Sequence, residues 1–74
     1  MGLTELTQQE IAALRRAAVW YAKYHESDIS GLADDPSAYA VVEREEYLDL
    51  IAALGKLGVR LPVPHGVVDE RQAA

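Results

Sequence analysis

The residues with the clearest chemical potential are a histidine and several carboxylates in the middle of the chain. His25 is followed three positions later by Asp28, and Glu43 and Glu46 repeat that spacing. Residues three apart share a helix face, and an imidazole with carboxylates can hold a divalent ion inside a helical bundle. The Glu-x-x-His motif of such sites is incomplete, because Ala22 stands three positions before His25. These four residues are therefore only weak ligand candidates, and we predict neither a metal nor another cofactor.

Catalysis by a nucleophile has even less support. His25 lies near Ser27 and Ser30, but no Gly-x-Ser-x-Gly elbow is present, and a chain of 74 residues is too short to enclose a deep pocket. No cysteine is present to supply a thiolate. The segment from Gly55 to Gly58 has a lysine between glycines, yet it closes a predicted helix, whereas phosphate loops open one. We predict that the protein is not an enzyme.

A capping box marks the start of the first predicted helix. Thr7 and Glu10 have the spacing at which each side chain accepts a hydrogen bond from the other residue's backbone N–H. From Gln8 to about Glu26 there is no glycine or proline. The segment is amphipathic at helical spacing. Its predicted apolar face consists of Ile11, Leu14, Ala17, Ala18, Tyr21, Tyr24 and His25, and its opposite face carries Arg15, Arg16 and Lys23.

A loop over residues 27–35 and a second helix over residues 36–57 are predicted next. Asp34 or Asp35 before Pro36 fits an N-cap followed by proline at the first helical position, although Val41 and Val42 allow a break near residues 38–42. The predicted apolar side consists of Tyr39, Glu43, Tyr47, Leu50, Ile51, Leu54 and Leu57. Gly58 followed by an apolar residue predicts a Schellman ending.

The predicted fold is all-α: a two-helix antiparallel hairpin over residues 7–58, preceded by a lead-in over 1–6 and followed by an extended arm and frayed tail over 59–74. Two helices cannot enclose a core alone. The open side is covered either by the arm folding back or by a second copy that completes a helix bundle, and the two can operate together. We expect self-association, with interface residues Leu14, Trp20, Tyr21, Tyr47, Leu50, Ile51 and Leu54.

Charge is unevenly distributed. The net charge is −5, and residues 26–49 contain eight of the twelve acidic residues. The acidic surface is predicted to comprise Asp34, Asp35, Glu43, Glu45, Glu46 and Asp49. A chain with this balance and no basic cluster is a poor match for nucleic acid or for an anionic membrane surface. No segment has the length of a membrane span, and the lack of cysteine favours the cytoplasm.

The sequence thus favours a small acidic helical interaction or adaptor protein that self-associates and binds a protein partner. Three alternatives stay open. One is an antitoxin-like regulator whose acidic block docks on a basic partner. Another is a carboxylate-rich bundle that binds metal. The third is a helical DNA-binding regulator in which a dimer presents Arg15, Arg16 and Lys23 jointly.

Overall fold

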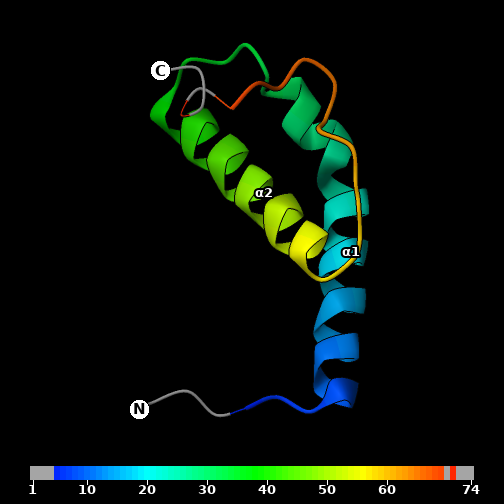
Figure 1. Ribbon diagram of the computed structural model, residues 1–74. Coiled ribbons are helices and arrows are strands. Elements are labelled where there is room, and N and C mark those ends of the chain that lie inside the picture. The colour runs from blue at the N-terminus through cyan, green and yellow to red at the C-terminus, as the bar shows by residue number, and fades with distance from the viewer. Residues whose placement is uncertain (1–4, 70, 72–74) are drawn as a thin grey trace.

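The first helix begins where the capping box predicts. The computed structural model describes residues 5–69 and 71, and its first helix, α1, spans Gln8–Gly31 (Figure 1). The Glu10 N–H donates to Thr7 Oγ1 at 3.0 Å, and the Thr7 N–H donates to Glu10 Oε1 at 2.7 Å. Both bonds satisfy N–H groups that lack partners inside the helix. The capping box is therefore confirmed.

The end of α1 corrects the predicted boundary. Residues 27–31, expected in a loop, continue the helix to Gly31. Ile29 lies on the same side as Ala22 at helical spacing, and both are buried in the core. Burial of the Ile29 side chain stabilises one more turn of α1, even though the serine, aspartate and glycine residues in that turn have low intrinsic helix propensity.

The second helix, α2, spans Ala38–Lys56, and its cap also differs from the prediction. Ser37, not Asp34 or Asp35, is the N-cap, and its hydroxyl accepts the Ala40 N–H at 3.2 Å. Asp35 instead accepts the Ser37 N–H at 2.9 Å, which closes a turn around Pro36. Pro36 consequently lies outside the helix rather than at its first position.

The end of α2 agrees with the predicted Schellman motif. Gly58 has φ +88, the Val59 N–H donates to the Leu54 carbonyl at 2.9 Å, and the Gly58 N–H donates to the Gly55 carbonyl at 3.1 Å. These bonds use the last free carbonyls of the helix, and the left-handed glycine turns the chain away from the helix axis.

The two helices form the predicted all-α hairpin, and the described residues contain no strand. Ala22 of α1 and Ala40 of α2 are fully buried, and their small side chains let the backbones approach closely. The N-terminal part of α1 projects beyond the end of α2 (Figure 1). The rest of the core is supplied by large residues of both helices and the arm, namely Ile29, Tyr47, Leu48, Ile51, Leu54 and Val67.

The arm that follows α2 folds back over its own hairpin. It runs from Val59 along α1 and across the hairpin toward the end where the two helices are joined (Figure 1). Val67 and Pro64 are buried, and the Ser30 hydroxyl donates to the His65 carbonyl at 2.7 Å. The Val67 N–H donates to the Pro64 carbonyl at 3.1 Å across a turn that contains Gly66. Of the two ways to complete the core, arm closure is thus present within one chain.

The buried side of each helix is rotated from the predicted one. On α1, Leu14, Tyr21 and Tyr24 were expected to face inward, but they are 57%, 48% and 64% exposed. On α2, Tyr39 and Leu57 are exposed as well. Of the predicted inward residues, Ala18 on α1 and Tyr47, Ile51 and Leu54 on α2 do face the core. The other inward positions lie outside the predicted faces, namely Val19, Ala22 and Ile29 on α1 and Ala40, Arg44 and Leu48 on α2. The physical reason is the arm, because the side chains of the helices that lie under it are the ones that become buried.

Candidate interaction surfaces

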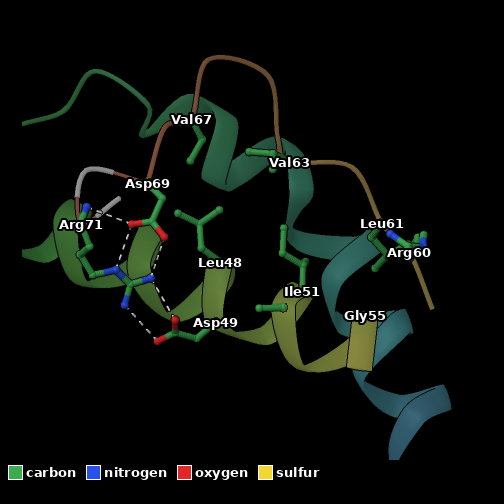
Figure 2. A pocket seen from close by; sticks show the side chains of 11 residues that line it. Leu48, Asp49, Ile51, Gly55, Arg60, Leu61, Val63, Val67, Asp69 and Arg71 are labelled. Atoms are coloured by element: carbon green, nitrogen blue, oxygen red, sulfur yellow. Dashed lines mark hydrogen bonds and ion pairs between the residues drawn. The ribbon is translucent and has the colours of Figure 1, made fainter. Parts of the chain in front are cut away.

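The side of the hairpin opposite the arm forms what we call the open face. At about 100° per residue, the exposed aromatic and aliphatic residues of both helices lie on this side. The described arm packs on the other side of the hairpin, where Val67 joins Leu48 and Ile51 in the core (Figure 2). The open face is composed of Leu14, Tyr21, Tyr24, Tyr39, Leu50 and Leu57.

Trp20 lies next to the open face, on the part of α1 where it also lines a hollow with Val19 and with Val59 of the arm. Its side chain is 67% exposed, and its ring stacks on Tyr24 with ring centroids 5.1 Å apart and an interplanar angle of 16°. Tryptophan and tyrosine are enriched among the residues that dominate interface energies. The pair therefore presents a preorganised aromatic surface.

The structure divides the predicted interface residues into two groups. Tyr47, Ile51 and Leu54 are at most 9% exposed and pack inside their own hairpin, so they support the protomer. The residues left accessible for contact with another molecule are Leu14, Trp20 and Tyr21, together with the half-buried Leu50.

A groove lies between the helices on the open face, near the loop that joins them. We call it the α1–α2 groove; it has a volume of about 540 Å³. Its polar and aromatic lining includes Tyr21, His25 and Asp28 from α1 and Tyr39 and Glu43 from α2. His25 Nδ1 lies 3.4 Å from Asp28 Oδ2, and the His25 ring centroid is 4.3 Å from that of Tyr21. The sequence suggested Asp28 and Glu43 for metal, but the structure adds two tyrosines to the same groove.

The weak metal candidates do not assemble into a site. Within residues 5–69 and 71, no group of three or more histidine, aspartate or glutamate side chains is arranged to hold a metal ion. Of the four candidates, His25, Asp28 and Glu43 line the α1–α2 groove, whereas Glu46 is exposed and is not part of the groove lining.

The predicted acidic surface is distributed over different parts of the fold. Asp34 is exposed in the loop, whereas Asp35 is half-buried and its pKa is lowered by the hydrogen bonds from Ser37. Glu43 faces the groove, and Glu45 is half-buried at a different site beside Val41 and Val68. Glu46 and Asp49 are exposed on α2. The acidic block of the sequence is thus not one continuous patch.

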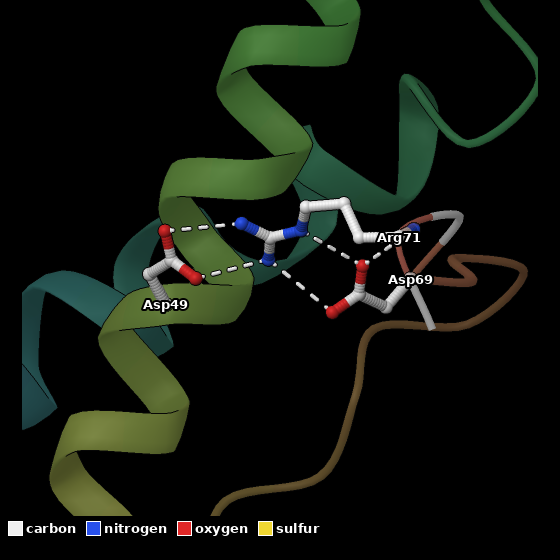
Figure 3. Close-up of polar contacts among 3 residues, drawn as sticks. All are labelled: Asp49, Asp69 and Arg71. Carbon is white, nitrogen blue, oxygen red and sulfur yellow. Dashed lines mark hydrogen bonds and ion pairs between the residues drawn. The ribbon is translucent and has the colours of Figure 1, made fainter. Parts of the chain in front are cut away.

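Asp49 belongs to an ionic cluster that ties the end of the arm to α2. The Arg71 guanidinium donates to Asp49 at 2.9 and 3.3 Å and to Asp69 at 3.0 and 3.2 Å (Figure 3). These bonds raise the pKa of Arg71 above its usual value and lower that of Asp69. The sequence predicted a frayed tail, but Arg71 is anchored; Glu70 and residues 72–74 lie outside the described residues.

The same cluster borders a second groove, which runs between the arm and α2. It has a volume of about 670 Å³ and an apolar floor that includes Leu48, Ile51 and Val67, with Arg60 near its other end (Figure 2). This groove follows from the way in which the arm packs, and its charged residues are largely engaged with one another.

Sequence reasoning missed the burial of Arg44 and the hydrogen bond of Tyr47, although it placed Tyr47 on the apolar side of the second helix. Arg44 is 5% exposed, and its guanidinium donates to the carbonyl oxygens of Leu32 and, at 2.7 Å, Asp35. The Tyr47 hydroxyl donates to the Ala22 carbonyl at 2.7 Å, and burial raises the pKa of Tyr47. A signal for Arg44 was available, since it is the only basic residue in the acidic block and lies four residues after Ala40 and three before Tyr47.

The comparisons with known proteins show no relationship. No family model matches the chain, and no significant match is found among curated proteins or among solved structures. Within the described residues, neither helix combines the length and apolar character required to cross a membrane.

Proposed function

We propose that this protein is a small, non-catalytic helical interaction protein of the cytoplasm that self-associates through the open face and binds a protein partner. One observation carries the proposal: the arm covers one side of the hairpin and leaves aromatic and aliphatic side chains exposed on the other. Tyr21, Tyr39 and Leu14 are each about half exposed or more. Large exposed apolar surfaces rimmed by polar residues are typical of sites that bind other proteins.

The amount of exposed surface supports self-association. The chain has 5736 Å² of accessible surface and a mass of 8.1 kDa. A compact monomer of that mass is expected to expose only about 4,500 Å², so the surplus is roughly 1,200 Å². A standard protein interface buries about 800 Å² on each partner. The surplus is thus large enough for a dimer interface.

A two-fold pairing of open faces would place four helices around a common core. Such a dimer is an isologous four-helix bundle in which each hairpin covers exposed leucines of the other, Leu14 and Leu57 among them, and leaves the α1–α2 groove open. Glu43 and Glu46 lie on the α2 part of this face, whereas Arg44, which stands between them in the sequence, is buried on the other side of the helix. Their mutual repulsion across the two-fold axis would be screened by salt, so we expect the dimer to tighten at higher ionic strength.

Sedimentation velocity over a dilution series tests this proposal. We expect the wild-type chain to change from dimer to monomer within a dilution series from about 1 mM to about 1 μM. Leu14→Glu places a charge on the open face and should leave only monomer. Val63→Glu is the matched control because Val63 is 52% exposed on the arm, away from that face.

Two results would contradict self-association through this face: a monomer at every concentration, or equal weakening by both substitutions. Circular dichroism of each variant checks that the helices are retained, which is expected because Leu14 is 57% exposed and lies outside the core.

One observation favours a second candidate, a regulator that docks on a basic partner. The α1–α2 groove combines two carboxylates with two tyrosines, and no arginine or lysine appears in its described lining. Complementary charge of this kind speeds association and selects partners. Here too the protein acts by binding.

A further inference from the structure

We propose that the α1–α2 groove binds an arginine or lysine side chain from a basic segment of a partner protein. The inference rests on the proposed function as an interaction protein and specifies the chemistry of the partner. It adds a recognition site to the self-association surface and requires no reaction.

The aromatic walls of the groove fit a cationic side chain. Tyr21 from α1 and Tyr39 from α2 both line it, and they are 48% and 66% exposed. Their ring faces carry negative electrostatic potential, which attracts an ammonium or guanidinium group within about 6 Å. Ile29 and Leu32 complete the lining, and the methylene groups of a long basic side chain can pack on them.

The charged residues of the groove select the same ligand. Glu43 is half-buried and forms no ion pair with any described residue. Asp28 contacts only His25, at 3.4 Å, in the described part of the chain. A guanidinium can bind a carboxylate through two parallel hydrogen bonds, so Glu43 is a suitable partner for an incoming arginine.

The alternative ligands fit less well. An anion would meet two carboxylates, and a metal ion would lack a set of three ligands, as the described residues show. The volume of about 540 Å³ is ample for one extended basic side chain and part of its backbone. Among the exposed surfaces of the hairpin, this groove therefore has the strongest match to a cation.

Fluorescence anisotropy with a labelled hexa-arginine peptide, acetylated and amidated at its ends, tests the proposal at low ionic strength. Hexa-lysine and hexa-glutamate peptides serve as comparisons. We expect both basic peptides to bind and hexa-glutamate not to bind. Binding should be weakened by salt, because the exposed charges are screened.

Two matched pairs of variants locate the site. Glu43→Gln should weaken hexa-arginine binding by about fivefold or more, whereas Glu45→Gln, which removes the same charge from another side of α2, should weaken it by less than about twofold. Tyr39→Ala should weaken binding by about threefold to tenfold, and Tyr39→Phe should stay within about twofold, since a phenyl ring retains the attraction to a cation.

Equal effects of Glu43→Gln and Glu45→Gln would overturn the proposal, because they would indicate a diffuse electrostatic field. An unchanged affinity in Tyr39→Ala, or no binding of hexa-arginine, would also overturn it. Sedimentation of the same samples separates the two proposals. If the protein forms a dimer but does not bind hexa-arginine, only the groove proposal is contradicted. If the protein is a monomer that binds hexa-arginine, only self-association is contradicted.

Discussion

Arg44 holds the junction between the helices from inside. A buried charge is costly unless its hydrogen bonds are satisfied, and the Arg44 guanidinium donates to the carbonyl oxygens of Leu32 and Asp35 on the connecting loop. These carbonyls follow the end of α1, where no helical N–H is available to them. The residue therefore fixes the loop that brings Asp28 and Glu43 to the same groove.

Gly66 has a conformation that other residues adopt only at a cost. Its φ is +83, and a Cβ atom at this position would lie 3.2 Å from Ala33 Cβ. We expect Gly66→Ala to lower the free energy of unfolding by about 1–2 kcal/mol, because L-residues are disfavoured in the left-handed region. In thermal melts this corresponds to a decrease in Tm of roughly 4–16 °C for a chain of this size.

Gly55→Ala is the control for that substitution. Gly55 lies within α2, has no positive φ, and has open space where a Cβ would be built. Alanine should raise the free energy of unfolding there by about 0.5–1 kcal/mol, because it restricts the unfolded chain and favours the helix. A Gly66→Ala protein as stable as the wild type would show that the turn over Pro64–Val67 does not constrain the arm.

The arm is the element that determines which sides of the helices are buried. Val67 packs with Leu48 and Ile51 beneath the crossing of the arm (Figure 2). Burial of such side chains contributes roughly 1.5–3 kcal/mol each. The arm can reach this position because Gly58 turns the chain back at the end of α2.

Asp69 and Arg71 help to hold the arm on α2, and the stability that they contribute depends on pH. Hydrogen bonds from Arg71 hold the pKa of Asp69 below its usual value. A lowered folded-state pKa contributes stability that is complete above the unfolded value and is lost as the pH falls through the folded value. We expect this contribution at neutral pH and its loss in acid.

Thermal melts of Asp69→Asn and the wild type from pH 7 to pH 2 measure that contribution. The variant should be the less stable protein at pH 7, and the difference should vanish at the acid end as Asp69 is protonated. Asp34→Asn is the control because Asp34 is exposed and forms no ion pair with a described residue, so this substitution should change the stability little at either end of the pH range. A difference between Asp69→Asn and wild type that is constant with pH would contradict the role of the cluster.

The molecule as a whole is extended for its length. Its radius of gyration is 13.9 Å, with extents of 39 × 28 × 19 Å. A compact domain of this length has an expected radius of gyration of about 11 Å. The projecting part of α1 contributes to this shape and offers surface to another molecule (Figure 1).

Self-association predicts that stability depends on protein concentration. When a folded dimer unfolds to monomers, each tenfold increase in concentration shifts the equilibrium by about 1.4 kcal/mol per dimer. We expect the wild-type Tm to rise by several degrees over two decades of concentration, whereas the Tm of Leu14→Glu should stay constant. A wild-type Tm that does not change with protein concentration would contradict the proposal that dimerisation is coupled to folding.

The sequence by itself determined the features that depend on neighbouring residues. Thr7 and Glu10 specify the start of α1 through two reciprocal hydrogen bonds, and Gly58 specifies the end of α2 by adopting a left-handed conformation. Between these signals glycine and proline occur only at Gly31, Pro36 and Gly55, and this was enough to predict two helices and an antiparallel hairpin.

Only the tertiary structure decided which residues form the core and which remain accessible. Ile29 extends α1 through a segment of poor helix formers because its side chain is buried. Tyr21 and Tyr39 fit the apolar stripes as well as Tyr47 does, yet Tyr47 alone is buried. Periodicity identifies a broad stripe, but the arm covers only one edge of it. The position of that long-range contact leaves the other edge, with Tyr21, Tyr39 and Glu43, on the surface.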